Sequence, residues 1–167
     1  MTLKAKLLAA SSAIFFSNAC AQVPDAVAQS AVSPIERVDA FYAALAAEDQ
    51  DAALGMLAPD AMLYAPYNPN GDATDAGIRS FPASMYVVGA MQTYDNLVFE
   101  DREYSVADDG GTVWIEAEGR LRVAATGKPY ENRYVFKIEL DEGKIVEVTE
   151  YTNVATLARD GVTAGAQ

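Results

Sequence analysis

The second half of this chain contains four long segments in which apolar and polar residues alternate. They span residues 96–106, 112–124, 130–140 and 144–154. Alternation with a period of two predicts β-strands that turn one face to a core and the other to solvent. The turns between them contain glycine and favour antiparallel hairpins; they are residues 108–111, 126–127 and 141–143. Strands of this length must twist and bend, so we expect a strongly curved, mostly antiparallel sheet.

The first half of the chain predicts helices. Ser33 and Glu36 have the spacing of a capping box, and Pro34 suits the first helical position. Apolar residues then recur at helical spacing as far as about Ala47; they are Ile35, Val38, Phe41, Tyr42 and Leu45. We therefore expect an amphipathic helix that packs this stripe on the core.

Two more helices and one strand are expected before the sheet. Residues 50–57 predict a short helix capped by Asp49, and residues 61–67 predict a strand. Residues 75–91 predict a third helix, which Pro82 should break or delay. The predicted fold class is therefore α+β, with three N-terminal helices packed in a strongly curved, mostly antiparallel sheet that encloses a cone.

The composition excludes several kinds of chemistry. Histidine is absent, and Cys20 is the sole cysteine. The sequence thus excludes Ser-His-Asp and Cys-His catalysis and histidine-based zinc sites, and we expect no metal and no cofactor. Acid–base chemistry must rest on Asp, Glu, Tyr or Lys. The formal net charge of -12 repels phosphate backbones, which makes nucleic acid an unsuitable partner.

The first 21 residues have the pattern of a secretory signal peptide. Two lysines precede an apolar stretch at residues 7–16, and Ala19-Cys20-Ala21 supplies small residues at A-x-A spacing. We expect cleavage after Ala21 and export to the periplasm or the exterior. An alternative retains Cys20, because residues 17–20 resemble a bacterial lipobox. In that case the lipidated cysteine would anchor the protein to a membrane.

The remainder predicts one domain with short appendages. Residues 22–32 are small and polar and predict a flexible tether. Residues 33–155 contain all the predicted helices and strands and form the domain. Residues 156–167 predict a frayed C-terminal tail.

The two middle strands of the predicted sheet place small and polar residues on the face toward the helices. In 112–124 this face includes Ala117 and Gly119, whose small size leaves room at mid-strand. In 130–140 it includes Asn132 and Tyr134. Buried polar groups need partners. These two side chains could therefore orient the oxygen of a ligand, or they could form hydrogen bonds with each other or with Glu150.

The last strand predicts a carboxylate inside the fold. If Val146 and Val148 face the core, Glu150 shares that face. The alternative register buries Ile145 and Tyr151 and leaves Glu150 in solvent. We favour the first register. An apolar interior should raise the pKa of this carboxyl, which suits proton abstraction near neutral pH.

Four stretches of the chain have counterparts in a known family. They are Pro34–Leu45, Asp49–Tyr64, Tyr130–Phe136 and Gly143–Tyr151. They resemble the SnoaL-like branch of the nuclear-transport-factor-two-like superfamily, the ketosteroid-isomerase-like cone, and with the order of the predicted elements the resemblance extends over about residues 34–155. The resemblance implies a bent sheet closed by three helices and a largely apolar pocket. Such domains often form a homodimer through the outer face of the sheet, and the resemblance implies this possibility here.

The resemblance also implies candidate site residues. The position of Glu150 holds a carboxylate in members that resemble limonene epoxide hydrolase. Their partner motif, Arg-x-Asp, would fall near residues 117–119 and is absent here. Of their Tyr-x-Asn pair, Tyr64 is present and the asparagine is not. The sequence therefore disfavours epoxide hydrolysis.

Two functions remain open. The first is an exported protein that binds a small apolar molecule in a pocket lined by Tyr64, Tyr86, Asn132, Tyr134 and Glu150. The second is a cofactor-independent isomerase, dehydratase or cyclase that uses Glu150 as its general base. Each residue also has a structural explanation, namely aromatic packing for the tyrosines and internal hydrogen bonds for Asn132 and Glu150.

Overall fold

The computed structural model describes residues 32–67 and 79–156. Its helices are α1 (Pro34–Ala46), α2 (Gln50–Gly55) and α3 (Ala83–Thr93). Its strands are β1 (Leu57–Ala65), β2 (Arg79–Pro82), β3 (Tyr94–Val106), β4 (Thr112–Val123), β5 (Pro129–Asp141) and β6 (Lys144–Thr152). The predicted signal peptide, the predicted tether up to residue 31 and the predicted tail from residue 157 lie outside these residues.

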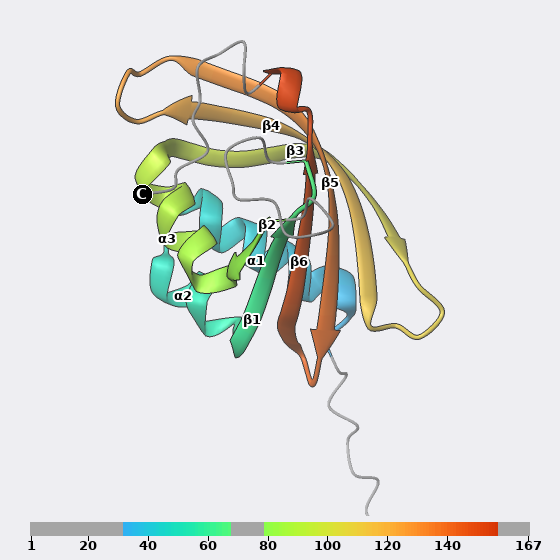
Figure 1. Cartoon of the computed structure of the whole chain (residues 1–167). Coiled ribbons are helices and arrows are strands. Elements are labelled where there is room, and N and C mark those ends of the chain that lie inside the picture. The colour runs from blue at the N-terminus through green and yellow to red at the C-terminus, as the bar shows by residue number, and fades with distance from the viewer. Residues whose placement is uncertain (1–31, 68–78, 157–167) are drawn as a thin grey trace, which may run out of the picture. The chain divides into compact units, whose positions relative to one another are not determined.

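The strands form one six-stranded sheet in the order β2-β1-β6-β5-β4-β3. Neighbouring strands are antiparallel, except that β1 and β6 run parallel. Figure 1 shows the sheet curving around α1, α2 and α3, which lie on its concave side. The predicted α+β class with a curved, mostly antiparallel sheet is confirmed.

The start of α1 follows the predicted capping box. The Ser33 side chain accepts a hydrogen bond from the Glu36 backbone N–H, and the Glu36 carboxylate accepts one from the Ser33 N–H. These two bonds satisfy backbone donors that lack partners within the helix. The stripe behind the cap is buried at Val38, Phe41 and Leu45. Local sequence thus determines where α1 begins and which face it buries.

Two predicted boundaries near the first strands were wrong. The third helix begins at Ala83, and residues 79–82 form β2 instead. Pro82 prevents helical pairing before it, so the late start predicted from this proline is correct. Strand β1 begins at Leu57 and contains Pro59, although we expected a strand only from residue 61. The pairing of β1 with β6 is irregular between Leu57 and Met62, and a proline is tolerated where the ladder needs no N–H.

Bulges in β3 account for much of the curvature at that edge of the sheet. The pairing with β4 shifts register between Asp95 and Val98 and again between Glu100 and Glu103. Within these intervals Asn96 and Asp101 have positive φ angles of 62° and 47°. Asn and Asp tolerate this conformation better than most residues. Each bulge inserts one residue and bends the strand, so the edge wraps around the helices.

A third bulge lies in β6 and resolves the two registers left open by the sequence. Glu139 pairs with Glu147, but Leu140 pairs with Ile145, so Val146 is the extra residue. The bulge interrupts the alternation of faces, and both Ile145 and Val148 are therefore buried. Beyond it, Glu150 pairs with Phe136 and shares its inward face. The favoured register is correct for Glu150, and the alternative is correct for Ile145.

Glycine at position 119 makes room for an aromatic ring inside the fold. A methyl group there would lie 2.5 Å from Cε2 of Tyr134. We expect Gly119→Ala to lower the free energy of unfolding by about 1–3 kcal/mol, because the stiff ring must move. Urea denaturation measures this. The matched control is Gly89→Ala in α3, where no atom lies within 4 Å of the added methyl.

The control should be neutral or stabilise by up to about 1 kcal/mol, since alanine favours a helix interior. If Gly119→Ala is as stable as the natural chain, the close approach of Tyr134 does not constrain this position.

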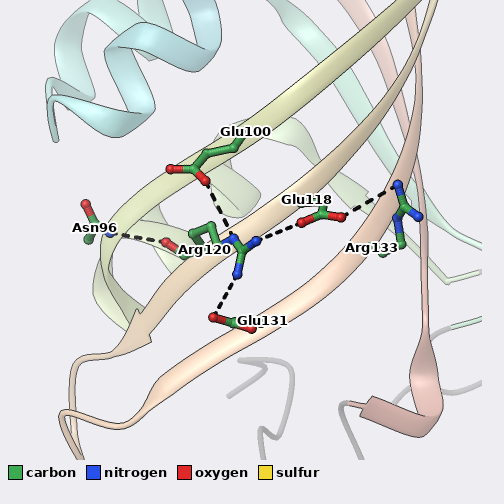
Figure 2. Close-up of polar contacts among 6 residues, drawn as sticks. All are labelled: Asn96, Glu100, Glu118, Arg120, Glu131 and Arg133. Carbon is green, nitrogen blue, oxygen red and sulfur yellow. Dashed lines mark hydrogen bonds and ion pairs between the residues drawn. The ribbon is translucent and has the colours of Figure 1, made fainter.

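The outer face of the sheet is charged and aromatic. Figure 2 shows the Arg120 guanidinium among carboxylates from three strands, at 3.5 Å from Glu100, 2.9 Å from Glu118 and 2.9 Å from Glu131. Exposed ion pairs of this kind add little stability. Farther along the face, the Tyr151 ring contacts those of Trp114 and Tyr67 at 6.3 and 6.0 Å. This face lies opposite the helices.

Candidate functional site

Glu150 lies near the C-terminal end of β6, on the side of the sheet that faces the helices. Its register partner on β5 is Phe136, which is fully buried. Glu150 is half-buried, so part of the residue still contacts solvent. Protein atoms nevertheless surround the carboxyl closely enough to raise its pKa from 4.5 to about 7, with burial as the cause. The sequence prediction of an inward carboxyl with a raised pKa therefore agrees with the structure.

Tyr86 of α3 is the hydrogen-bond partner of Glu150. Its hydroxyl donates to the carboxyl, which stabilises the ionised form and partly opposes the rise in the pKa of Glu150. The pKa of Tyr86 is itself raised well above 10, mainly by burial and then by the nearby charge of Glu150. Tyr86 therefore stays protonated at neutral pH and remains a donor. The predicted pocket residues Tyr86 and Glu150 are in contact.

Five tyrosines lie close enough to Glu150 to sense its charge, and with it they form what we call the tyrosine cluster. They are Tyr42 of α1, Tyr86 of α3, Tyr94 of β3, and Tyr130 and Tyr134 of β5. Burial is the main cause of the raised pKa of each, and the charge of Glu150 adds to it. All five are neutral near pH 7.

Asn132 of β5 forms hydrogen bonds that have a structural role. It is 6% exposed, and its Nδ2 donates to the Tyr130 hydroxyl at 2.7 Å, to Thr152 Oγ1 at 2.8 Å and to the Asn153 carbonyl at 3.2 Å. Its Oδ1 accepts from the Arg133 backbone N–H at 2.9 Å. These bonds fasten the end of β6 to β5. They occupy the side chain that we predicted to line the pocket.

Tyr134 is buried in an aromatic stack. Its ring lies parallel to that of Phe136, with centroids 5.4 Å apart, and edge-on to that of Phe99 at 5.3 Å. Its hydroxyl is hydrogen-bonded to that of Tyr130. The structure thus places this predicted pocket residue beside Glu150 and ties its hydroxyl to a neighbour.

Tyr64 does not join the tyrosine cluster, which corrects its predicted place in the pocket. It pairs with Thr149 of β6, whereas Leu63 pairs with Val148. Since Val148 and Glu150 face inward, Thr149 and its partner Tyr64 face outward. The sequence did not reveal that β1 runs parallel to β6, so the face of Tyr64 could not be inferred.

Tyr42 and Tyr94 are members of the cluster that sequence reasoning missed as site residues. Tyr42 is part of the apolar stripe of α1 and is 3% exposed, so its pattern is that of a core residue. Tyr94 directly follows α3 and stacks on Tyr130 with centroids 5.6 Å apart. Both lie near Glu150 because of how the helices pack on the sheet, and no local sequence pattern specifies that packing.

An open depression lies elsewhere on the domain. It has a volume of about 600 Å³ and is lined by Asp39, Phe99, Glu100, Asp101, Arg102 and Tyr104. Arg102 pairs with Asp39 at 3.4 Å, and Tyr104 donates a hydrogen bond to the same carboxylate. The central charges of this depression are therefore neutralised internally.

Neither a metal site nor a membrane span is found within residues 32–67 and 79–156. No three of the side chains His, Cys, Asp and Glu come together there as metal ligands. No helix in these ranges combines the length and apolarity needed to cross a bilayer.

Comparison with known families gives a match over most of the domain. The model of the SnoaL-like domain matches residues 38–148. The chain belongs to the SnoaL-like family. A curated relative, phenazine biosynthesis protein PhzB 2 of Pseudomonas aeruginosa, is 36% identical over 64 residues. That alignment covers 36% of this chain and 36% of the relative, so it spans about a third of the relative's length.

Solved structures similar to this SnoaL-like domain share its fold. A nuclear-transport-factor-two-like protein from Burkholderia xenovorans has a TM-score of 0.56 at 23% identity, covering 75% of this chain and 92% of the other. A protein of ketosteroid isomerase-like fold from Catenulispora acidiphila, in complex with trimethylamine, has a TM-score of 0.60 at 18% identity, covering 81% and 98%. The phenazine biosynthesis-related protein of P. aeruginosa has a TM-score of 0.58 at 17% identity, covering 85% and 93%. The predicted superfamily is confirmed.

Proposed function

We propose that this SnoaL-like domain binds a small, largely apolar molecule beside Glu150. The observation that carries the proposal is an inward carboxyl, half-buried among tyrosines, whose hydrogen-bond donor is Tyr86. Keeping a carboxyl in such surroundings destabilises its charged form, and a ligand that uses the carboxyl is a physical reason to retain it. The fold of the Catenulispora protein, which is in complex with trimethylamine, accommodates a small molecule.

A second candidate is a proton-transfer enzyme of the isomerase, dehydratase or cyclase type. The observation that favours it is the pKa of Glu150, raised by burial to about 7, which leaves both protonation states populated at neutral pH. The phenazine biosynthesis protein PhzB 2, by its name, takes part in a biosynthetic pathway. Against turnover, the hydroxyls of Tyr130 and Tyr134 bond to each other. Tyr86 then remains as the donor nearest the acid.

Binding and turnover of a panel of small apolar carbonyl compounds and epoxides test the two candidates. We expect at least one compound to bind the natural chain by accepting a hydrogen bond from the protonated Glu150 carboxyl, and Glu150→Gln to weaken binding at least tenfold because an amide N–H is the weaker donor. Native mass spectrometry and calorimetry measure binding. Glu116→Gln, an exposed acid on the outer face, is the control and should bind normally.

The outcomes separate the two functions. If Glu150→Gln keeps its affinity for the compound but no longer converts it to product, the protein is an enzyme. If no compound binds and no small molecule accompanies the protein purified from its own source, both functions are rejected.

Export and pairing of two copies are further proposals that rest on the sequence. Two lysines, an apolar stretch and the small residues 19–21 support export, and the intact mass of the mature protein distinguishes cleavage after Ala21 from lipidation of Cys20. The exposed Trp114 and its aromatic neighbours support pairing through the outer face. Analytical ultracentrifugation tests this, and a monomer at high concentration would contradict it.

A further inference from the structure

The carboxyl of Glu150 has no basic partner among the residues that the structure describes. Burial and the Tyr86 hydrogen bond are the influences on it, and no arginine or lysine is among them. Several basic side chains are engaged elsewhere: Arg102 with Asp39, Arg120 and Arg133 with glutamates of the outer face, and Lys137 with Glu139 and Glu147. Within the described residues, the charge of Glu150 is therefore not compensated by a basic side chain.

The side chains around this carboxyl are aromatic rings, which attract cations. The faces of tyrosine rings carry negative potential and bind ammonium and guanidinium groups. One ring of the tyrosine cluster already does so, because the Arg102 guanidinium lies 5.9 Å from the centroid of Tyr42. Tyr86 and Tyr94 are partly exposed, so they are the members of the cluster that solvent reaches. The cluster thus combines one anion with several ring faces.

We propose that the molecule bound beside Glu150 is an organic cation, with an apolar body and an ammonium nitrogen. This inference rests on the proposed binding function and specifies its ligand class. An ammonium group within about 4–6 Å would supply the missing counter-charge. The methyl or methylene groups on the nitrogen would meet the tyrosine rings, as in aromatic cages that bind quaternary ammonium ligands. A neutral molecule of the same shape would gain only the ring contacts.

The proposal predicts a pH dependence of binding with a definite sign. The groups that face Glu150 are Tyr42 from α1, Tyr86 from α3, Tyr94 from β3, and Tyr130 and Tyr134 from β5, and burial keeps all of them neutral below pH 9. A permanent cation prefers the ionised carboxylate. With a pKa of about 7, about a tenth of Glu150 is ionised at pH 6 and about nine tenths at pH 8. Affinity should therefore rise about tenfold between these pH values.

The test compares choline with 3,3-dimethylbutan-1-ol, which has nearly the same shape and no charge. Both are titrated into the full-length protein at pH 6 and pH 8, and NMR signals of the tyrosine rings report binding. At pH 8, we expect choline to bind at least tenfold more tightly than the alcohol. We also expect the affinity for choline to be about tenfold higher at pH 8 than at pH 6. The affinity of the alcohol should not change with pH.

Two variants complete the design. Glu150→Gln should reduce the affinity for choline to that for the alcohol and remove the pH dependence, whereas Glu116→Gln should match the natural chain. If the alcohol binds as tightly as choline, or if neither binds while a neutral compound of the earlier panel does, the ligand is not a cation and the binding function stands. If nothing binds in either experiment, both proposals fail.

Discussion

Glu150→Gln should make the protein more stable than the natural chain at pH 8, by up to about 3 kcal/mol, and equally stable at pH 4. In the natural chain the pKa of Glu150 is 4.5 when unfolded and about 7 when folded, because burial penalises the charge. The folded state therefore binds the proton more tightly. The contribution of this tighter proton binding to folding stability is complete below about pH 4.5 and is lost as the pH rises through 7. The energy follows from about 1.4 kcal/mol per tenfold change in proton affinity and is an upper limit, since Glu150 is half-buried.

Urea denaturation at pH 4, 6, 7 and 8 measures this effect. The chain has no histidine, so few other groups change charge between pH 6 and 8. Glu116→Gln is the control and should show the same pH dependence as the natural chain. Parallel curves for Glu150→Gln and the natural chain across this range would mean that Glu150 titrates as an exposed carboxyl.

Phe136→Ala should lower the free energy of unfolding by about 3–5 kcal/mol. Phe136 is fully buried, and its ring contacts those of Tyr42, Phe99 and Tyr134 at centroid distances of 5.3–5.4 Å. Removing it leaves a cavity between α1 and the sheet that the surrounding rings cannot fill without moving. It also removes the inward neighbour of Glu150 on β5. Calorimetric or urea unfolding measures the loss.

Phe136→Leu is the matched variant for this prediction. It keeps most of the apolar volume, so its cost should be less than half that of the alanine variant. A cost below about 1 kcal/mol for Phe136→Ala would contradict the close packing of the aromatic rings around Glu150.

Local sequence patterns predicted those parts of the fold that depend on neighbouring residues. The capping box at Ser33 marks the start of α1, and the strands of the second half agree with β3 to β6 within two residues. Hairpins join these strands, so each finds its partner nearby. Strand β1 pairs with β6, although the two strands lie near opposite ends of the domain in sequence. Strand β2 pairs only with β1. No local signal specifies such distant pairings, which is why the start of β1 was misplaced and strand β2 was not predicted.

The candidate site was only partly predictable, because local patterns indicate the face of a residue within its own strand but not what packs against it. Alternation along β6 favoured an inward Glu150 but left a second register open, and alternation along β5 indicated an inward Tyr134. Tyr42 and Tyr94 approach Glu150 because helix α1 and the start of β3 pack there. Tyr64 was assigned to the pocket because of the resemblance, but its strand pairs in a register that turns it outward. Which residues meet across the interior depends on tertiary packing.

The extra residue Val146 has a consequence for how such a domain can evolve. Its deletion would leave the pairs from Glu139–Glu147 to Phe136–Glu150 in place, because the bulge confines the additional residue to one point of β6. The loss of that codon would therefore straighten the strand and keep the interior acid where it is. Deletion of a codon between Glu147 and Glu150 would instead turn the acid to the opposite face without altering it. Among descendants of a common ancestor, gain or loss of a reactive interior can thus follow from where a strand changes length rather than from substitution.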